Sequence, residues 1–156
     1  MNDEWFSLHS SNITDTYKGI PRQEIFKQNI LKQYNVLKER GIRPFMFGDM
    51  LLKSHNGDND GPRKGLYQVA SELPRDIYIL NWTQQIDPTS NRTLHELGFP
   101  VINFCNGFVP CPQDRDFISG VGLFAYGLSH KSSGIINDTY SRQLGYSAHI
   151  RIADYA

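Results

Sequence analysis

Apolar side chains form two kinds of pattern along this chain, one helical stripe and several short continuous runs. The stripe occupies residues 21–40, where apolar positions recur every three or four residues and predict a helix. Pro21 suits the first turn of this helix, and Gly41 suits its end. The stripe consists of Phe26, Ile30, Tyr34 and Leu37.

Four short apolar runs predict strands, and one of them, DIYILNW, is apolar on both faces, as is typical of a buried parallel strand. The four runs are RPFMFGDML, DIYILNW, PVINF and SGIIND, and they begin near residues 44, 77, 101 and 134. Helical segments are expected between and after them. These are a short stretch near 65–72, a helix over 90–98 that Gly98 stops, the segment RDFISGVGLFAYGLSH and the tail YSAHIRIADYA.

Strands that alternate with helices indicate βα units and a parallel sheet, so the predicted fold class is α/β. No internal linker divides the chain, and residues 1–156 are expected to form a single domain. The length is sufficient for one domain with a hydrophobic core.

Polar or aromatic residues follow each predicted strand. The first strand ends at Gly48-Asp49 and the second at Asn81-Trp82, the third runs into Asn103, Asn106 and Phe108, and the fourth runs into Asn137, Asp138 and Tyr140. In (β/α)8 barrels the active site is assembled at the carboxyl ends of the strands. The N-terminal Asp3-Glu4-Trp5 would form a fifth such end, placed just before the first helix.

Composition narrows the classes of partner and location. Hydrophobic residues make up 39% and charged residues 21%, which indicates a globular chain. The 16 basic and 16 acidic residues give a formal net charge of +0, so nothing in the charge favours nucleic acid or an anionic membrane. No apolar run approaches the ~20 residues of a membrane span, and the N-terminus lacks a signal-peptide pattern. A cytoplasmic location is therefore expected.

Metal and modification motifs are weak, and neither a metal site nor a cofactor is expected. Cys105 and Cys111 lack the spacing of a zinc site, which leaves two free thiols or a short-loop disulfide. The loop from His55 to Gly61 lacks the spacing of a calcium loop, so a solvated loop is favoured. Asn-x-Thr triplets are treated as chance; they begin at Asn12, Asn81, Asn91 and Asn137.

Taken in order, these segments resemble the C-terminal half of the catalytic barrel of glycoside hydrolase family 20, the β-N-acetylhexosaminidases. The resemblance covers nearly the whole chain and rests on an Asp-Glu pair, a helix, and then FMFGDML, LPRDIYILNW and LGFPVINF. Its most specific elements are Asp3-Glu4, Gly48-Asp49 and Asn81-Trp82. The resemblance implies half of a (β/α)8 barrel with about four parallel strands.

The resemblance also implies a mechanism and a substrate. Glu4 would protonate the leaving oxygen, while Asp3 would orient the substrate's acetamido group, which acts as the nucleophile. An adjacent carboxylate helps to raise the pKa of a general acid. Trp82 would stack on the sugar ring, and Asp49 would bind its hydroxyls. Weaker candidates for the carbohydrate site are Phe47, Phe108 and Tyr140, which stand near positions where the family has Trp, Tyr and Trp. The lead-in His-x-Gly of the family is absent.

Each of these residues also has a plainer interpretation: an acidic, frayed terminus for Asp3-Glu4, packing for Trp82, and a turn with Gly48 for Asp49. Since a complete barrel needs about 250 residues, half a barrel would leave two bare sheet edges and an apolar inner face. We therefore expect either a homo-oligomer or a partnership with a missing N-terminal half. The alternatives to a glycosidase half-site are a non-catalytic carbohydrate-binding module and a structural fragment.

Overall fold

The computed structural model describes residues 18–59, 61–106 and 115–124. Four of the predicted site residues lie outside these ranges; they are Asp3, Glu4, Phe108 and Tyr140. The strand predicted near residue 134 and the helix predicted for the C-terminal tail lie outside them as well.

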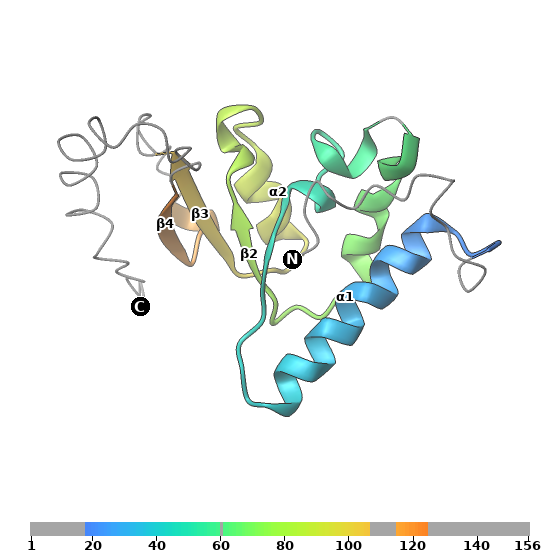
Figure 1. The fold of residues 1–156 in the computed structure, drawn as a ribbon. Helices are drawn as coiled ribbons and strands as arrows, with labels where there is room; N and C mark the ends of the chain where they lie inside the picture. The colour runs from blue at the N-terminus through green and yellow to red at the C-terminus, as the bar shows by residue number, and fades with distance from the viewer. Residues whose placement is uncertain (1–17, 60, 107–114, 125–156) are drawn as a thin grey trace, which may run out of the picture.

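The described residues form a four-stranded sheet in which every pairing is parallel (Figure 1). Its strands are β1 (Phe45–Phe47), β2 (Tyr78–Asn81), β3 (Val101–Asn106) and β4 (Gly120–Phe124). They lie side by side in chain order, β1-β2-β3-β4. The predicted α/β class with a parallel sheet is confirmed for this part of the chain.

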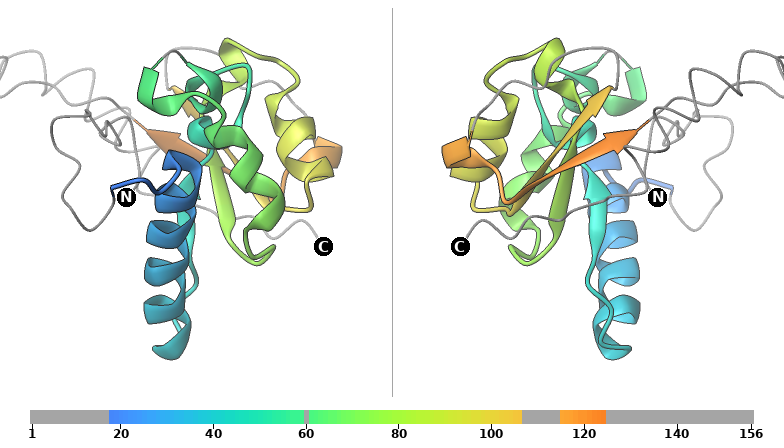
Figure 2. Two further views of the ribbon diagram at one scale, coloured as in Figure 1. Left: turned by 90° about the vertical axis from the view of Figure 1, so that its right-hand side faces the viewer. Right: turned by 90° about the vertical axis from the view of Figure 1, so that its left-hand side faces the viewer.

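Chain-ordered strands constrain where the connections run. Parallel crossovers are almost always right-handed, so the steps from β1 to β2 and from β2 to β3 put their helical connections on the same face of the sheet. The two views of Figure 2 agree with this, because the helices lie in front of the strands in one view and behind them in the other. A doubly wound sheet would reverse its strand order and carry helices on both faces.

Helix α1 (Arg22–Glu39) confirms the first predicted helix almost to the residue. Pro21 precedes it, and the chain leaves it through Gly41, whose φ of 67° suits a residue without Cβ. There the Gly41 amide donates to the Lys38 carbonyl and the Ile42 amide to the Leu37 carbonyl, at 3.0 and 2.9 Å. This pair of bonds is the Schellman motif, which satisfies carbonyls that the helix end leaves unpaired.

Two shorter helical segments cover the sheet beside α1. The stretch predicted near 65–72 is the 3-10 helix η6 (Leu66–Glu72) rather than an α-helix. Helix α2 (Ser90–Glu96) lies in the predicted 90–98 region, and the chain leaves it through Gly98, whose φ is 90°. The Phe99 amide donates to the Leu94 carbonyl at 3.3 Å, so the exit from α2 repeats the arrangement at the end of α1.

The segment RDFISGVGLFAYGLSH was predicted to be helical, and this prediction is wrong for its described part. It begins with the 3-10 turn η8 (Arg115–Phe117) and continues as strand β4. In β4, Gly120 pairs with Ile102, and Gly122 pairs with Phe104. A Cβ on Gly122 would collide with the Phe104 ring, so glycine lets this aromatic side chain lie across the neighbouring strand.

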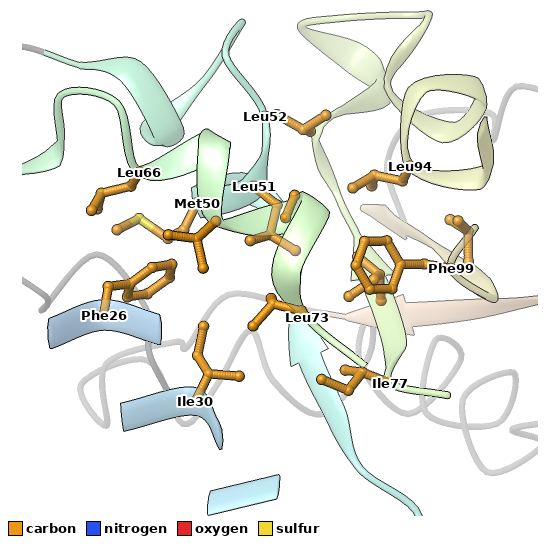
Figure 3. Close-up of a cluster of buried hydrophobic side chains, with 14 residues drawn as sticks. Phe26, Ile30, Met50, Leu51, Leu52, Leu66, Leu73, Ile77, Leu94 and Phe99 are labelled. Atoms are coloured by element: carbon orange, nitrogen blue, oxygen red, sulfur yellow. The ribbon is translucent and has the colours of Figure 1, made fainter. Parts of the chain in front are cut away.

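The hydrophobic core lies between the helical layer and one face of the sheet (Figure 3). Phe26 and Ile30 reach it from α1, Leu66 from η6, and Leu94 from α2, and all four are buried. Burying a side chain of this kind stabilises a fold by about 2 kcal/mol relative to exposure. Ile79 and Val101 reach the core from the sheet, and Ile77 from the position just before β2.

The opposite face of the sheet, here called the inner face, carries the alternate strand positions. Because paired residues point to the same side, the register assigns it Phe45, Phe47, Tyr78, Leu80, Ile102 and Phe104. Phe45 and Tyr78 stack at 5.2 Å between ring centroids, and Phe47 meets Phe104 edge to face at 6.4 Å. None of the helical segments in the described ranges crosses this face (Figure 2).

Within these same ranges, no helix combines the length and the apolar character that a membrane crossing requires.

Candidate functional site at the carboxyl ends of the strands

Buried polar side chains gather where the parallel strands end. Asp49 follows β1, Asn81 ends β2, and Asn103 of β3 pairs with Asn81 in the neighbouring strand. All three are fully buried, and Asn81 and Asn103 occupy paired positions on the helix-facing side of the sheet. Further buried polar residues in the segments that follow these strands are Asn56, Thr83, Gln84, Ser90 and Asn91.

Asn81 is the centre of a hydrogen-bonded cross-link between β2 and the start of α2. Its side-chain amide donates to Ser90 Oγ at 2.8 Å and to Asn91 Oδ1 at 2.7 Å. Its Oδ1 accepts from the amide and the hydroxyl of Thr83, at 3.1 and 2.8 Å. This asparagine therefore uses both its donor and its acceptor capacity to fix the turn after β2 and the first turn of α2.

Two of the Asn-x-Thr triplets begin at buried asparagines, which decides whether they can be glycosylated. Asn81 and Asn91 are both 0% exposed. Glycosylation of such triplets needs a surface position, so neither asparagine is an acceptor in this fold. The triplet Asn81-Trp82-Thr83 instead serves as a turn in which the first side chain binds the third residue.

Asp49 is held by the loop that follows β1. Asn56 donates its amide to Asp49 Oδ2 at 2.7 Å and is itself bound through Oδ1 by Arg63 at 2.8 Å. Asn56 and Gly57 are buried, so the loop predicted to be solvated is partly packed into the fold. A Cβ on Gly57 would stand 2.6 Å from the Leu52 carbonyl oxygen, which explains glycine at this point.

His55 brings this loop against the end of β2. Its ring meets the Trp82 ring edge to face, with 4.9 Å between centroids and 81° between planes. Both side chains are partly exposed, but His55 Nδ1 is buried and has no hydrogen-bond partner within the described structure. His55 thus packs against Trp82, which retains some accessible surface.

A second contact ties the same loop to the segment after β2. Ser54 donates its hydroxyl to Asp87 Oδ2, and Thr89 donates to Asp87 Oδ1 from its hydroxyl at 2.7 Å and from its amide at 2.9 Å. Burial alone would raise the pKa of Asp87, but the bonds from Ser54 and Thr89 outweigh it and hold the pKa below its ordinary value. Asp87 is therefore an ionised anchor near neutral pH.

Gln84 links the turn after β2 to β3. Its side-chain amide donates to the Phe104 carbonyl at 2.9 Å, and the residue is only 1% exposed. Its Oε1 is buried and without a hydrogen-bond partner in the described residues. The carboxyl edge thus carries buried acceptor and ring-nitrogen atoms at Gln84 and His55 beside the aromatic Trp82.

The structure brings three of the seven predicted site residues to this edge. Phe47 ends β1, Asp49 follows it, and Trp82 follows the adjacent β2. Trp82 and Phe47 keep partial exposure, whereas Asp49 is enclosed. Sequence reasoning missed His55, Asn56 and Gln84, because they follow strands by several residues and only the fold returns them to the edge.

Across the described ranges, no three His, Cys, Asp or Glu side chains lie close enough together to hold a metal ion.

Comparison of the chain with protein-family models found no match, and neither did comparison with curated proteins.

Proposed function

We propose that this chain is a half-barrel of the glycoside hydrolase class, resembling the β-N-acetylhexosaminidases, and that its carboxyl edge binds a terminal N-acetylhexosamine. The observation that carries the proposal is the pair of partly exposed aromatic residues, Phe47 and Trp82, at the carboxyl ends of adjacent parallel strands. This is the edge at which barrel enzymes assemble their sites.

The strand order supports the barrel component of the proposal. Four parallel strands in chain order are the arrangement expected of half of an eight-stranded barrel. The helices would form the outer ring, and the inner face, from Phe45 to Phe104, would line the barrel interior. A barrel interior is filled by layers of branched and aromatic side chains, and the inner face has that character.

Trp82 is the proposed stacking wall for the sugar. The apolar face of a pyranose ring lies well against an aromatic plane. His55 packs against Trp82 edge to face, so it restricts the orientation of the indole without covering both of its faces. A wall fixed in this way loses little side-chain entropy when a ligand binds.

Asp49 contributes mainly by holding the loop that carries His55. Its carboxylate is fully buried and bound by Asn56, so a direct bond to a sugar hydroxyl requires the loop to move. Because His55 and Asn56 are adjacent in the chain, the Asp49–Asn56 bond also fixes the position of His55 against Trp82.

Hydrolysis in this proposal depends on Asp3 and Glu4. Glu4 donates a proton to the leaving oxygen, and Asp3 orients the acetamido group, whose oxygen attacks the anomeric carbon. The C–O bond to the leaving group breaks as the oxazolinium ring closes, and water then opens that ring. General acid catalysis of this kind contributes about 10²–10⁴-fold to a rate.

Two variants test the proposal with a chromogenic N-acetylglucosaminide. We expect Glu4→Gln to lower turnover by at least about 100-fold, because the amide has no proton to give. The control Glu39→Gln, at the exposed end of α1, should leave turnover unchanged. Turnover that survives Glu4→Gln contradicts the proposed mechanism.

Binding is tested separately by calorimetry with N-acetylglucosamine. Trp82→Ala should weaken binding about tenfold, a loss of about 1.4 kcal/mol, whereas Trp82→Phe should recover much of it because a ring remains. Binding without turnover would identify a carbohydrate-binding module. If the wild-type chain neither binds the sugar nor hydrolyses the substrate, the proposal fails.

A further inference from the structure

Asn56 and Gly57, in the loop after β1, form a chemically reactive dipeptide. The backbone nitrogen that follows an asparagine can attack the carbonyl carbon of its side chain, and glycine allows this most readily because it has no side chain to hinder the approach. The sequence holds two such pairs, Asn56-Gly57 and Asn106-Gly107. Gly107 lies outside the described residues, so the structure bears on the first pair.

The fold requires glycine at the second position of this pair. A Cβ on Gly57 would stand 2.6 Å from the Leu52 carbonyl oxygen and 2.7 Å from that of Met50. A side chain here would slow the attack on Asn56, but no side chain fits between these backbone atoms. The loop therefore keeps a reactive pair for a packing reason.

Hydrogen bonds hold both polar atoms of the Asn56 side chain. Its Nδ2 donates to Asp49 Oδ2 at 2.7 Å, and its Oδ1 accepts from Arg63 at 2.8 Å and from Asn59 at 2.9 Å. The residue is only 5% exposed. Attack requires the side chain to turn until its carbonyl carbon meets the Gly57 nitrogen, and these three bonds oppose that rotation.

The attacking nitrogen is held as well. The Gly57 amide donates to the Leu52 carbonyl at 3.0 Å, and both residues of the pair belong to the 3-10 turn η4 (Asn56–Asp58). The reaction needs this nitrogen free and deprotonated, with the backbone rotated out of its helical dihedrals. The loop must therefore open first, and loops open locally without unfolding of the whole chain.

We propose that Asn56 is a deamidation site protected by the folded loop, and that its conversion releases the loop that packs His55 against Trp82. The Gly57 nitrogen forms a bond to Asn56 Cγ, and the bond from Cγ to the side-chain nitrogen breaks. The proton of the attacking nitrogen leaves with that group as ammonia, and a five-membered succinimide ring remains. Water then opens the ring at either carbonyl, which yields aspartate or isoaspartate with a new carboxylate.

The new carboxylate would lie against the carboxylate of Asp49. It would replace the bond from Asn56 Nδ2 to Asp49 Oδ2 by repulsion between two like charges. Arg63 already lies beside this side chain, but one guanidinium offsets only one of two charges. Leaving the other charge buried is costly, so the product favours an open loop.

The release would reach the candidate site through the chain itself. His55 precedes Asn56 directly, and its ring meets the Trp82 ring at 4.9 Å between centroids. Because refolding does not restore the amide, each molecule that reacts stays altered. The inference rests on the loop alone and does not require the chain to act on sugars.

Protection is measured by peptide mapping with mass spectrometry, on the full chain held in mildly alkaline buffer. We expect Asn56 to react at least about tenfold more slowly in the folded chain than in urea, because only open molecules react. Arg63→Met removes one bond to Asn56 and should raise the rate in the folded chain about fivefold. The control Lys64→Met changes an exposed neighbouring cation and should leave the rate unchanged. Equal rates in folded and unfolded chains, or equal rates in the two variants, overturn the proposed protection.

A core variant separates opening of the loop from unfolding of the whole chain. Ile30 is buried and lies beside Phe45 and Ile77, at the amino ends of the strands. Ile30→Val removes a methyl group there and lowers stability without touching the loop, so the rate at Asn56 should stay within about twofold of the wild type. Acceleration as large as that of Arg63→Met would mean that global unfolding controls the reaction, and the inference would be wrong.

Release of the loop is followed by the fluorescence of Trp82 in a Trp5→Phe background. Asn56→Asp carries the product carboxylate and should make quenching by acrylamide at least about twofold stronger, because His55 no longer packs against the indole. Asn35→Asp adds the same charge on the exposed surface of α1 and should change nothing. Naturally deamidated chain, separated by ion exchange, should behave like Asn56→Asp and gives the same readout without a variant at this position. Quenching that stays at the wild-type level overturns the proposed release.

Discussion

Single asparagines determine the geometry at the carboxyl edge. Asn81 makes four hydrogen bonds from a fully buried position and so joins β2, the turn after it and the start of α2. An amide can act in this way because it offers two donors and a two-lone-pair acceptor without carrying charge. Removing it would leave Ser90, Asn91 and Thr83 with buried polar groups to satisfy.

Asn81→Ala is expected to destabilise the fold by about 3 kcal/mol, because each buried group left without a partner costs about 1–3 kcal/mol. Urea denaturation followed by circular dichroism measures this loss. The control is Asn35→Ala on the exposed surface of α1, which should change stability by no more than about 0.5 kcal/mol. Equal effects of the two changes would mean that the Asn81 cross-link contributes nothing.

At the residue scale, the sequence predicted which positions lie at the candidate site, but it did not predict the role of each residue there. Asp49 and Asn81-Trp82 were recognisable because they follow apolar strand runs. That Asp49 would be enclosed by Asn56, and Trp82 packed by His55, depends on how the 52–59 loop folds back. Such contacts arise from tertiary packing, which a local pattern does not encode.

Among the elements, the loop after β1 is irregular in its backbone but tightly packed. It runs through two 3-10 turns, η3 (Asp49–Leu51) and η4 (Asn56–Asp58), and packs Gly57 against backbone oxygens of Met50 and Leu52. Backbone atoms in the core cannot move aside as a flexible side chain can. The loop therefore tolerates no side chain at Gly57.

Gly57→Ala should destabilise the chain by about 2 kcal/mol or more, because the new methyl group overpacks a fixed site. Gly48→Ala should cost less. Its Cβ would meet side-chain atoms, the nearest being Ile79 Cγ2 at 2.5 Å, and adding Ile79→Leu should restore part of the loss. Denaturant midpoints of the three variants test this order. A Gly57→Ala midpoint equal to that of the wild type would contradict it.

Helix α1 is tied to the start of β2 by one small ionic cluster. Lys38 and Tyr34 donate to the two oxygens of Asp76 at 2.7 and 2.9 Å. These two bonds hold the pKa of Asp76 below its ordinary value, and the bond from Lys38 has the larger effect. Since the folded pKa is the lower one, the stabilisation is present above about pH 4 and is lost as the pH falls through the folded pKa.

Asp76→Asn should therefore lower stability at pH 6 by up to about 1 kcal/mol, the range for exposed ion pairs, and should have a smaller effect at pH 3. Thermal unfolding at the two pH values gives this difference. Asp116→Asn changes an exposed aspartate outside the cluster and is the control. Its effect on stability should be the same at the two pH values. If the difference in stability between Asp76→Asn and the wild type grew as the pH fell to 3, the prediction would be wrong.

The elements with the most regular hydrophobic pattern were predicted most accurately. The long stripe of α1 and the apolar runs of β1, β2 and β3 were located correctly, to within about two residues. Strand β4 was missed because GVGLF sits within a longer apolar segment, and helix and strand are ambiguous in short apolar runs. Its glycines were the available signal, since two of them fall on one face of a strand.

For the whole molecule, the net charge matters more than any single ion pair. With 16 basic and 16 acidic residues, the chain has little repulsion to keep copies apart near neutral pH. The chain order of the strands followed from the βα rhythm.

Lowering the pH to 5 should raise the solubility of the chain, because added protons move its net charge from +0 to a positive value. Static light scattering across pH 5–8 measures this. The gain should shrink in about 0.5 M salt, where exposed charges are screened. Solubility that is highest at neutral pH would contradict the electrostatic argument.

The cross-link around Asn81 has a consequence for how pH acts on this molecule. Its members, Asn81, Asn91, Ser90 and Thr83, are carboxamides and hydroxyls, none of which gains or loses a proton between about pH 3 and pH 10. The end of β2 and the beginning of α2 are therefore held together by hydrogen bonds whose members do not ionise in this pH range. A pH profile recorded at this edge would report ionisable groups outside this set of hydrogen bonds, such as Asp87, and the set itself would add nothing to it.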